Sequence, residues 1–263
     1  MSTPTIRIER TSRGVARLTL ARAEKHNALN IEMIRSLGVA AETLGEDASI
    51  RAVVLAGDGA SFCAGADLGW MREQAVKDKP ARLAEAMELA GMLQALDRLP
   101  KLLIARVQGP AYGGGVGLLA VCDIVIAADT AKFALTETRL GLIPATIGPF
   151  IVRRLGEGGA RRVMLNAKTM DAREALAAGL VSVVVAPGEL DAAVDAEVTA
   201  ALACAPGAIA DAKALCQQLA RNPAADQRGW SAEQLARRWE TAEAQEGLAS
   251  FFEQAPPSWR SGN

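Results

Sequence analysis

The chain has 263 residues, of which half are hydrophobic and 4% are aromatic, so one large domain or one domain with a small appendage fits, with a core packed mainly by aliphatic side chains. The 29 Lys and Arg nearly balance the 30 Asp and Glu, and a net charge of -1 gives no reason to expect nucleic acid as a partner. No stretch is long and apolar enough to span a membrane, and no signal-peptide pattern is seen. We therefore expect a soluble, cytoplasmic protein without membrane partners.

The single histidine, His26, and the spacing of the cysteines limit the chemistry. A Ser-His-Asp or Cys-His system would have to use this one histidine, and a histidine-rich metal site is impossible. No cysteine pair has CxxC or zinc-ligand spacing, so we interpret the four cysteines as small buried residues in a reducing compartment. If the chain is an enzyme, its acid and base groups are therefore carboxylates.

The N-terminal part predicts short strands and one capped helix. Residues 5–10 and 15–20 alternate apolar and polar side chains, as the strands of a half-buried hairpin do. Asn30 is a suitable cap for a helix over residues 31–44. The apolar run 51–57 ends in glycine and predicts a buried strand.

A loop and a second helix are expected next. The segment 57–70 is rich in glycine and predicts an irregular connection. Pro80 favours the first turn of a helix, where its missing N–H costs little. Four apolar residues recur on one face of this helix, which is typical of a face packed on the core: Leu83, Met87, Ala90 and Leu93.

The remainder changes from mixed to wholly helical. Strands are expected at residues 102–109, 121–128, 132–135 and 181–185. Residues 146–178 are predicted to be helical in pieces, broken at 156–159 and 168–170, and the chain from 187 to about 254 is helical. Because strands and helices do not alternate one for one, a plain doubly wound sheet fits poorly.

Two glycine segments could bring backbone N–H groups to a ligand. In FCAGADL at 62–68, small residues let a backbone approach closely. In GPAYGGGVGLL at 109–119, three glycines precede a short apolar helix, whose free N–H groups could bind an anion or an oxyanion. A tight turn and close helix packing are the respective structural alternatives.

Glu137 lies in the largely apolar segment 133–144. A carboxylate in apolar surroundings has a raised proton affinity and can act as acid and base in turn near neutral pH. The alternative is a glutamate at a helix N-terminus that satisfies backbone donors. If two backbone N–H groups polarise a carbonyl, Glu137 could move a proton at the α or γ carbon, which is enolate chemistry without metal or histidine.

The same segments resemble the crotonase family, also called the enoyl-CoA hydratase/isomerase family, over nearly the whole chain. The similar stretches, in order, are ARAEKHNAL, SFCAGADL, QGPAYGGGVGLLAVCDIVIAAD, FALTETRLGLIPATIG, GLVSVVV and EGLASFFEQAPPSW. The resemblance implies an α/β fold: a spiral of repeated ββα units over 1–198 that carries the CoA-thioester site, and a C-terminal helical trimerisation region over 199–263. It also implies a homo-oligomer, either a trimer or a dimer of trimers.

The resemblance further implies roles for single residues. The N–H groups of Ala66 and Gly114 would hold the thioester oxygen of an acyl-CoA, and Glu137, which matches the second glutamate of a typical hydratase, would be the main acid/base group. The remaining substrate and CoA positions would be Lys25, Ala28, Ala64, Asp67, Leu68, Gly69 and Gly117. No metal is implied, and no cofactor beyond the coenzyme A of the substrate.

One position departs from the two-glutamate pattern. The first hydratase glutamate would lie three residues after Gly114, where this chain has Gly117. The surrounding stretch resembles hydratases of branched glutaconyl-CoA intermediates in leucine and acyclic terpenoid breakdown. Glycine there would leave room and remove a negative charge beside a substrate carboxylate. We therefore expect a 2-enoyl-CoA hydratase, with a 3-methylglutaconyl-type thioester as the branched candidate.

Three alternatives remain. The first is a Δ3,Δ2-enoyl-CoA isomerase that uses Glu137 alone, and the second is a non-catalytic CoA-binding protein. The third is a nicotinamide enzyme, because residues 115–120 match GxGxxA. The strand expected before that motif ends near Val107, so the tight strand–turn–helix of a dinucleotide site is missing.

Overall fold

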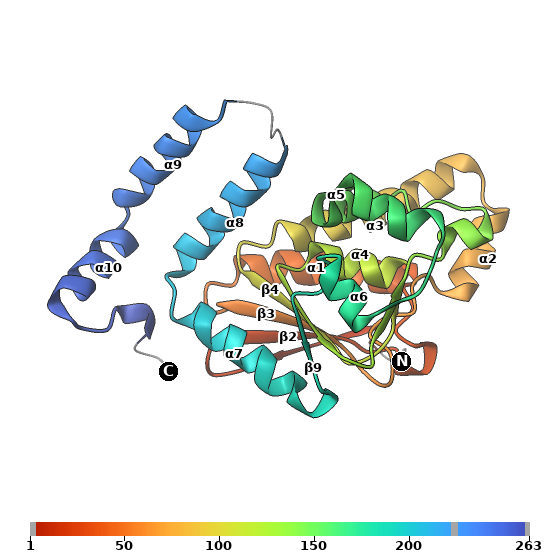
Figure 1. Ribbon diagram of the computed structural model, residues 1–263, viewed down its shortest axis with the longest axis horizontal. Helices are drawn as coiled ribbons and strands as arrows, with labels where there is room; N and C mark the ends of the chain where they lie inside the picture. Colours follow the sequence, from red (N-terminus) through yellow and green to blue (C-terminus); the bar gives the residue numbers. More distant parts are fainter. Residues whose placement is uncertain (1–3, 222–225, 261–263) are drawn as a thin grey trace.

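The computed structural model describes residues 4–221 and 226–260, and its main sheet has the order β1-β2-β3-β4-β6-β9 (Figure 1). The predicted hairpin is confirmed by antiparallel pairing of β1 (Ile6–Arg10) with β2 (Val15–Leu20). From β2 onward all neighbours are parallel. The other strands are β3 (Ala52–Gly57), β4 (Leu102–Val107), β6 (Ile124–Ala128) and β9 (Val183–Val185).

A second layer of short extended segments follows the main strands. It contains β5 (Ala111–Tyr112), β7 (Lys132–Ala134) and β8 (Met170–Asp171), paired in that order. Isolated bridges Leu29–Ala66 and Cys63–Ala111 continue this layer toward the N-terminus. Four of the long strands, β2, β3, β4 and β6, are thus each followed by a short extended segment and then a helix, which is the expected spiral of ββα units.

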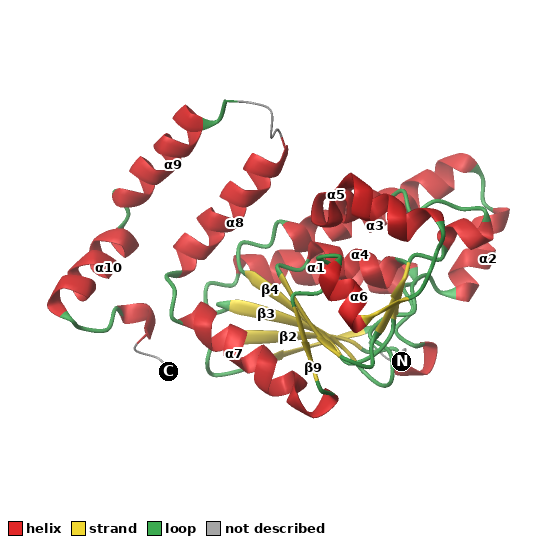
Figure 2. Ribbon diagram, viewed as in Figure 1, coloured by secondary structure: helices red, strands yellow, loops and turns green. Residues whose placement is uncertain are grey.

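Helices cover both faces of the main sheet (Figure 2). On one face lie α1 (Ile31–Glu46), α3 (Lys79–Asp97), α4 (Gly114–Val121), α5 (Gly148–Leu165) and α6 (Ala172–Ala177). On the other face α7 (Leu190–Leu202) packs its apolar side against Val54, Ile104 and Ile126. Their neighbours Val53, Leu103 and Val125 belong to the larger core, as the alternation of side chains along a strand requires.

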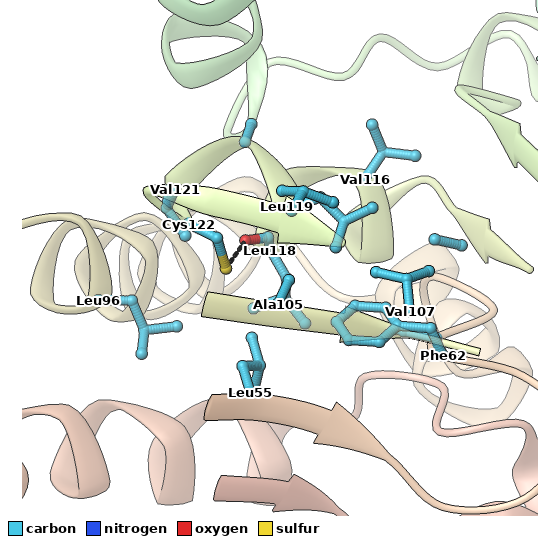
Figure 3. Close-up of a cluster of buried hydrophobic side chains, with 14 of the residues drawn as sticks. Leu55, Phe62, Leu96, Ala105, Val107, Val116, Leu118, Leu119, Val121 and Cys122 are labelled. Atoms are coloured by element: carbon cyan, nitrogen blue, oxygen red, sulfur yellow. Dashed lines mark hydrogen bonds between the residues drawn. The ribbon is translucent and has the colours of Figure 1, made fainter. Parts of the chain in front are cut away.

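The helix α4 is surrounded by core. Every residue from Gly115 to Val121 is buried. Figure 3 shows Leu118 directed toward Ala105 of β4, with Leu55 of β3 beyond it, and the Cys122 thiol donating to the Leu118 carbonyl at 3.2 Å. Such close packing fixes the N-terminus of α4 in space.

Two features between residues 57 and 97 differ from prediction. The glycine-rich segment is followed by a helix that was not predicted, α2 (Leu68–Val76). The predicted apolar face of the next helix is wrong for Leu83 and Met87, which are 59% and 63% exposed, and is confirmed for Leu93, which is buried together with Met92 and Leu96. The first half of α3 pairs with α2 instead of entering the core.

The other predicted boundaries hold with small changes. The Asn30 side chain accepts from the Met33 N–H at 2.9 Å and caps α1 as predicted. Helix α5 runs through the glycine segment with a kink at Gly156 (φ +68°), and the break at 168–170 leads into β8. The short 3-10 turns are η1 (Ala23–Lys25), η2 (Glu137–Leu140), η3 (Pro187–Glu189) and η4 (Ser258–Arg260).

The C-terminal helices form an arm beside the core (Figure 1). They are α8 (Pro206–Arg221), α9 (Arg228–Trp239) and α10 (Ala242–Glu253), and none has a fully buried residue. Residue 198 lies within helix α7. The division of the chain into 1–198 and 199–263 stays a prediction.

Two findings bear on the cysteines and on membranes. Cys63 and Cys122 are buried as predicted, but Cys204 and Cys216 are exposed. Within residues 4–221 and 226–260, no single helix is long and apolar enough to span a membrane. The bent pair 187–202 and 206–221 would be long and apolar enough only if the two helices are counted together, and this rests on length and composition alone.

Candidate active site

The three predicted catalytic positions follow interior strands of the main sheet. Ala66 comes after β3, Gly114 after β4, and Glu137 after β6 and β7. Neighbouring parallel strands end at the same edge of a sheet, so the loops that follow them meet there. The fold therefore brings three segments that are distant in sequence to one place.

The backbone around Ala66 is held by the strip that contains Leu29. The Leu29 N–H donates to the Gly65 carbonyl at 2.7 Å, and the Asp67 N–H donates to the Leu29 carbonyl at 2.9 Å. Because N–H directions alternate along an extended chain, the Ala66 N–H is directed away from Leu29. Among the described residues it donates to no acceptor.

The second N–H is brought close to the first by two glycines. A Cβ atom at Gly65 (φ +95°) would lie 3.0 Å from the Tyr112 carbonyl oxygen, and one at Gly113 (φ +47°) would lie 3.8 Å from the Gly65 Cα. Both glycines thus permit a close backbone approach and a left-handed φ. Gly114 follows as the first residue of α4, where an N–H has no partner within the helix. The described residues supply it no other acceptor.

The Glu137 carboxylate lies against this glycine pair. Its Oε1 would be 3.2 Å from a Cβ at Gly113. Its Oε2 is buried and has no hydrogen-bond partner in the described part of the chain. Burial raises the pKa of Glu137 above its ordinary value, although the backbone N–H groups of Glu137 and Thr136 partly offset the effect. A protonatable group is therefore placed next to two free N–H donors.

Hydrogen bonds on its C-terminal side fix the turn that carries Glu137. The Thr138 hydroxyl donates to the Met164 carbonyl at 3.2 Å, and Arg139 donates to the Ala167 carbonyl at 2.6 Å. Gly141 ends the turn in the left-handed conformation, with φ +71°. These contacts tie η2 to the end of α5.

Arg22 and Asn27 organise the neighbouring turn. The sequence assigned neither of them a role of its own, although Asn27 lies inside the turn from Lys25 to Ala28 that was expected to line the CoA path. Arg22 donates to the Ala28 carbonyl at 2.6 Å and to the Asp67 carboxylate at 2.9 Å. The Asn27 side chain is fully buried, accepts from the Arg22 N–H at 3.0 Å and donates to the Ser61 carbonyl at 2.9 Å. Both lie within ARAEKHNAL, the stretch that first carried the family resemblance, so a signal was present.

The predicted CoA positions fall on two adjoining strips. The Ala64 N–H donates to the His26 carbonyl at 2.9 Å, so the turn from Lys25 to Ala28 lies beside residues 64–67. Lys25 is exposed and Ala28 is buried. The structure thus brings these positions together, while their contact with CoA stays a prediction.

Three further predicted positions begin α2. Leu68 and Gly69 are exposed, but the Asp67 carboxylate is occupied, because it accepts from the Gly69 and Trp70 N–H groups and from Arg22. Burial alone would raise the pKa of Asp67, but these donors outweigh burial and lower it. Asp67 thus caps α2 and joins it to the turn that precedes it.

The surroundings of Gly117 correct one expectation. A Cβ at Gly117 would lie 2.4 Å from Ile147 Cγ2 and 3.0 Å from Ile147 Cβ, and Ile147 is only 3% exposed. The expectation that glycine at this position leaves free room was wrong, because the Ile147 side chain fills that room. The space beside α4 is therefore apolar, and a glutamate at 117 would have to displace Ile147.

The chain is similar to known proteins in both sequence and fold. The model of the enoyl-CoA hydratase/isomerase family matches residues 10–262. The crystal structure of an enoyl-CoA hydratase from Shewanella pealeana is similar, with a TM-score of 0.93 and 38% identity, covering 97% of this chain and 96% of that one. AtuE from Pseudomonas aeruginosa has a TM-score of 0.92 and 36% identity, and the match covers 98% of this chain and 100% of AtuE. An enoyl-CoA hydratase from Mycobacterium smegmatis has a TM-score of 0.90 and 35% identity, with the same coverage of 98% and 100%.

The chain therefore belongs to the enoyl-CoA hydratase/isomerase family. It is an enzyme of that type, and an acyl-CoA thioester is the class of substrate that fits it. The α/β spiral and the helical C-terminal region predicted from sequence are those of its structural relatives.

Proposed function

We propose that this enzyme is a 2-enoyl-CoA hydratase whose acid/base group is Glu137. The observation that carries the proposal is the Glu137 carboxylate, half-buried, with one oxygen unpartnered in the described structure, beside the glycine pair that leads into Gly114. Such a group can exchange protons with a bound substrate instead of serving a structural contact.

The proposed reaction uses the chain's own groups and the CoA thioester, with no metal or other cofactor. The thioester oxygen accepts from the Ala66 and Gly114 N–H groups. Water adds its oxygen to the β carbon while its proton passes to the Glu137 carboxylate, and negative charge develops on the thioester oxygen, where the two donors stabilise it. Glu137 then gives the proton to the α carbon, so one H and one OH are added and the enzyme returns to its first state.

The test is turnover of crotonyl-CoA by wild type and by Glu137→Gln. The variant keeps the size of the side chain and removes the base, so we expect the rate to fall by about 10²–10⁴ while thioester binding, measured by calorimetry, persists. Near-normal turnover by the variant would refute the role of Glu137. Binding of crotonyl-CoA by wild type without hydration, and without double-bond migration in a 3-enoyl-CoA, would favour a non-catalytic CoA-binding protein. Binding of NAD instead would favour a nicotinamide enzyme.

The Δ3,Δ2-enoyl-CoA isomerase is the second candidate, and Ile147 favours it. An apolar side chain beside Gly117 provides no second carboxylate to activate water, whereas moving a proton between the α and γ carbons needs one acid/base group. Comparing hydration of a 2-enoyl-CoA with double-bond migration in a 3-enoyl-CoA separates the two activities.

A branched 3-methylglutaconyl-type thioester is the proposed acyl group. Its one support is the missing negative charge at Gly117, because the Ile147 side chain already fills the room that glycine was expected to leave for a branched acyl group. The test places a glutamate at 117 in an Ile147→Ala background, which supplies the room. We expect the ratio of kcat/KM for 3-methylglutaconyl-CoA over crotonyl-CoA to be lower in the double variant than in Ile147→Ala alone. An equal ratio in the two variants would contradict the proposal of an anionic acyl group.

We further propose a cytoplasmic homo-oligomer, a trimer or a dimer of trimers, without nucleic-acid or membrane partners. The support is the apolar surface of the C-terminal arm, where Trp239, Phe251 and Phe252 are 52%, 76% and 77% exposed. Exposed aromatic side chains of this kind mark interaction surfaces. Light scattering of a dilute sample tests the proposal, and a monomer would contradict it.

A further inference from the structure

The hairpin of α2 and the first half of α3 is held to the protein with little hydrophobic packing. No residue of α2 is fully buried, and its first and last residues, Leu68 and Val76, are 73% and 87% exposed. In α3 the first buried residue is Met92. Trp70, which packs against the core, and Met71 are half-buried, and polar contacts supply the rest of the attachment of α2.

One carboxylate of α3 accepts hydrogen bonds from two side chains of α2 and from Lys77, the residue that ends α2. Glu85 accepts from Trp70 Nε1 at 2.5 Å and also from Gln74 and Lys77. These donors are spaced four and three residues apart, so they project from one face of α2. The Glu85 side chain is 16% exposed, and hydrogen bonds from Lys77 and Trp70 lower its pKa, so it is charged at neutral pH.

Two other ties hold α2. Just beyond its end, Arg82 of α3 donates to the Lys77 carbonyl at 2.9 and 2.6 Å. The second tie is at the start of the helix, one residue after Ala66. There Asp67 caps the helix and accepts from Arg22 at 2.9 Å. If α2 turned about its start, it would move the exposed Leu68 side chain and strain the two backbone hydrogen bonds to Leu29, at 2.7 and 2.9 Å, that flank Ala66. The Glu85 carboxylate resists this turn together with Arg82, because it accepts hydrogen bonds along the length of the helix, from Trp70 to Lys77.

We propose that Glu85 is a positioning residue: by holding α2, it fixes the Ala66 N–H in the oxyanion site and limits the length of acyl chain that can lie beside Leu68. This inference rests on the proposed function, because it takes Ala66 as a donor to the thioester. A donor contributes fully when it is fixed in advance at the place where charge develops.

The test compares Glu85→Gln with Glu88→Gln. Glu88 lies one turn along the same helix but binds Arg35 of α1 at 2.5 and 2.8 Å, so it controls for loss of any α3 carboxylate. In Glu85→Gln we expect faster hydrogen exchange of the α2 amides. We also expect roughly a tenfold fall in kcat for crotonyl-CoA, the size of one lost hydrogen bond to a charged group, with little change in KM.

The ratio of kcat/KM for 2-decenoyl-CoA over crotonyl-CoA should rise in Glu85→Gln and not in Glu88→Gln. This ratio does not depend on the fraction of folded enzyme, so a purely structural defect would leave it unchanged. Equal exchange in the two variants, or faster exchange with an unchanged ratio, would overturn the inference. Turnover by wild type tests the proposed function separately, because the exchange measurement needs no substrate.

Discussion

Two helices begin at the proposed oxyanion site and are held there by different means. Helix α4 starts at Gly114 and is buried along its remaining length, whereas α2 starts two residues after Ala66 and has no fully buried residue. One donor is thus fixed by the hydrophobic core. The other is fixed by hydrogen bonds: those between its flanking backbone and Leu29, and those of Asp67 and Glu85 with polar partners.

This difference gives the site one rigid side, at α4, and one side that can adapt, at α2. A donor mounted on the core can move only if the core rearranges, which close packing resists. A donor mounted on polar contacts can change position at small cost to the rest of the fold, so α2 is the part of the site where variation in substrate would be accommodated.

Shortening one leucine in each helix should give the largest contrast in stability. Leu118→Ala in α4 removes a side chain with no exposure and should cost about 2–5 kcal/mol in the free energy of unfolding. Leu68→Ala in α2 starts from 73% exposure and should change that free energy by no more than about 0.5 kcal/mol. Urea unfolding measures both, and equal losses would contradict the comparison.

Removing the donor on the α4 side should give the largest loss of activity in this comparison. Gly114→Pro deletes the N–H at the first position of the helix, where proline is tolerated, and should cost about 2.7–4 kcal/mol of transition-state stabilisation. Gly114→Ala is the matched control, since it brings a Cβ to the same place, 2.8 Å from Leu29 Cδ1, and keeps the N–H. Equal kcat/KM for the two variants would exclude the oxyanion role of Gly114.

A methyl group on the packed side of α4 should give an intermediate effect. Gly117→Ala places a Cβ 2.4 Å from Ile147 Cγ2 and should cost about 1–3 kcal/mol of stability by overpacking. In an Ile147→Ala background that cost should fall by more than half, because the crowding atom is gone. A double-mutant cycle of unfolding free energies measures the coupling, and additive costs would show that Ile147 does not fill the space.

The smallest expected effect is a dependence of stability on pH through Glu137. Burial raises the pKa of Glu137 in the folded protein above its ordinary value, so this residue contributes stability at low pH that is lost as pH rises through the folded pKa. Glu137→Gln should therefore be more stable than wild type at neutral pH, and the difference should vanish on the acidic side. Melting temperatures across pH measure it; a constant difference would argue against the raised pKa.

Much of the core could be predicted from sequence because local patterns and packing agree there. The hairpin and the interior strands have apolar residues where the sheet needs them, and Asn30 provides the oxygen that caps α1. The three predicted catalytic positions rest on a different kind of signal, because glycine motifs and the family resemblance indicated them without any geometry.

The contacts that tie the site together could not be predicted in the same way. Helix α2 has no apolar face, so its sequence lacks the periodicity by which helices are recognised. The exposed Leu83 and Met87 show the reverse error, in which helical spacing of apolar residues was taken for burial. The pairing of Gly117 with Ile147 joins positions 30 residues apart, and no local rule connects a glycine to the side chain that fills its place.

The order of the strands also has a consequence for how the molecule comes apart. Ala66, Gly114 and Glu137 follow β3, β4 and β6, which lie inside the sheet, while β1 and β9 form its edges. In a spiral where each turn rests mainly on its neighbours, fraying begins at the ends and moves inward. The three groups thus sit on the turns that open last, and an enzyme that has begun to lose its outer strands would still keep its reactive groups assembled.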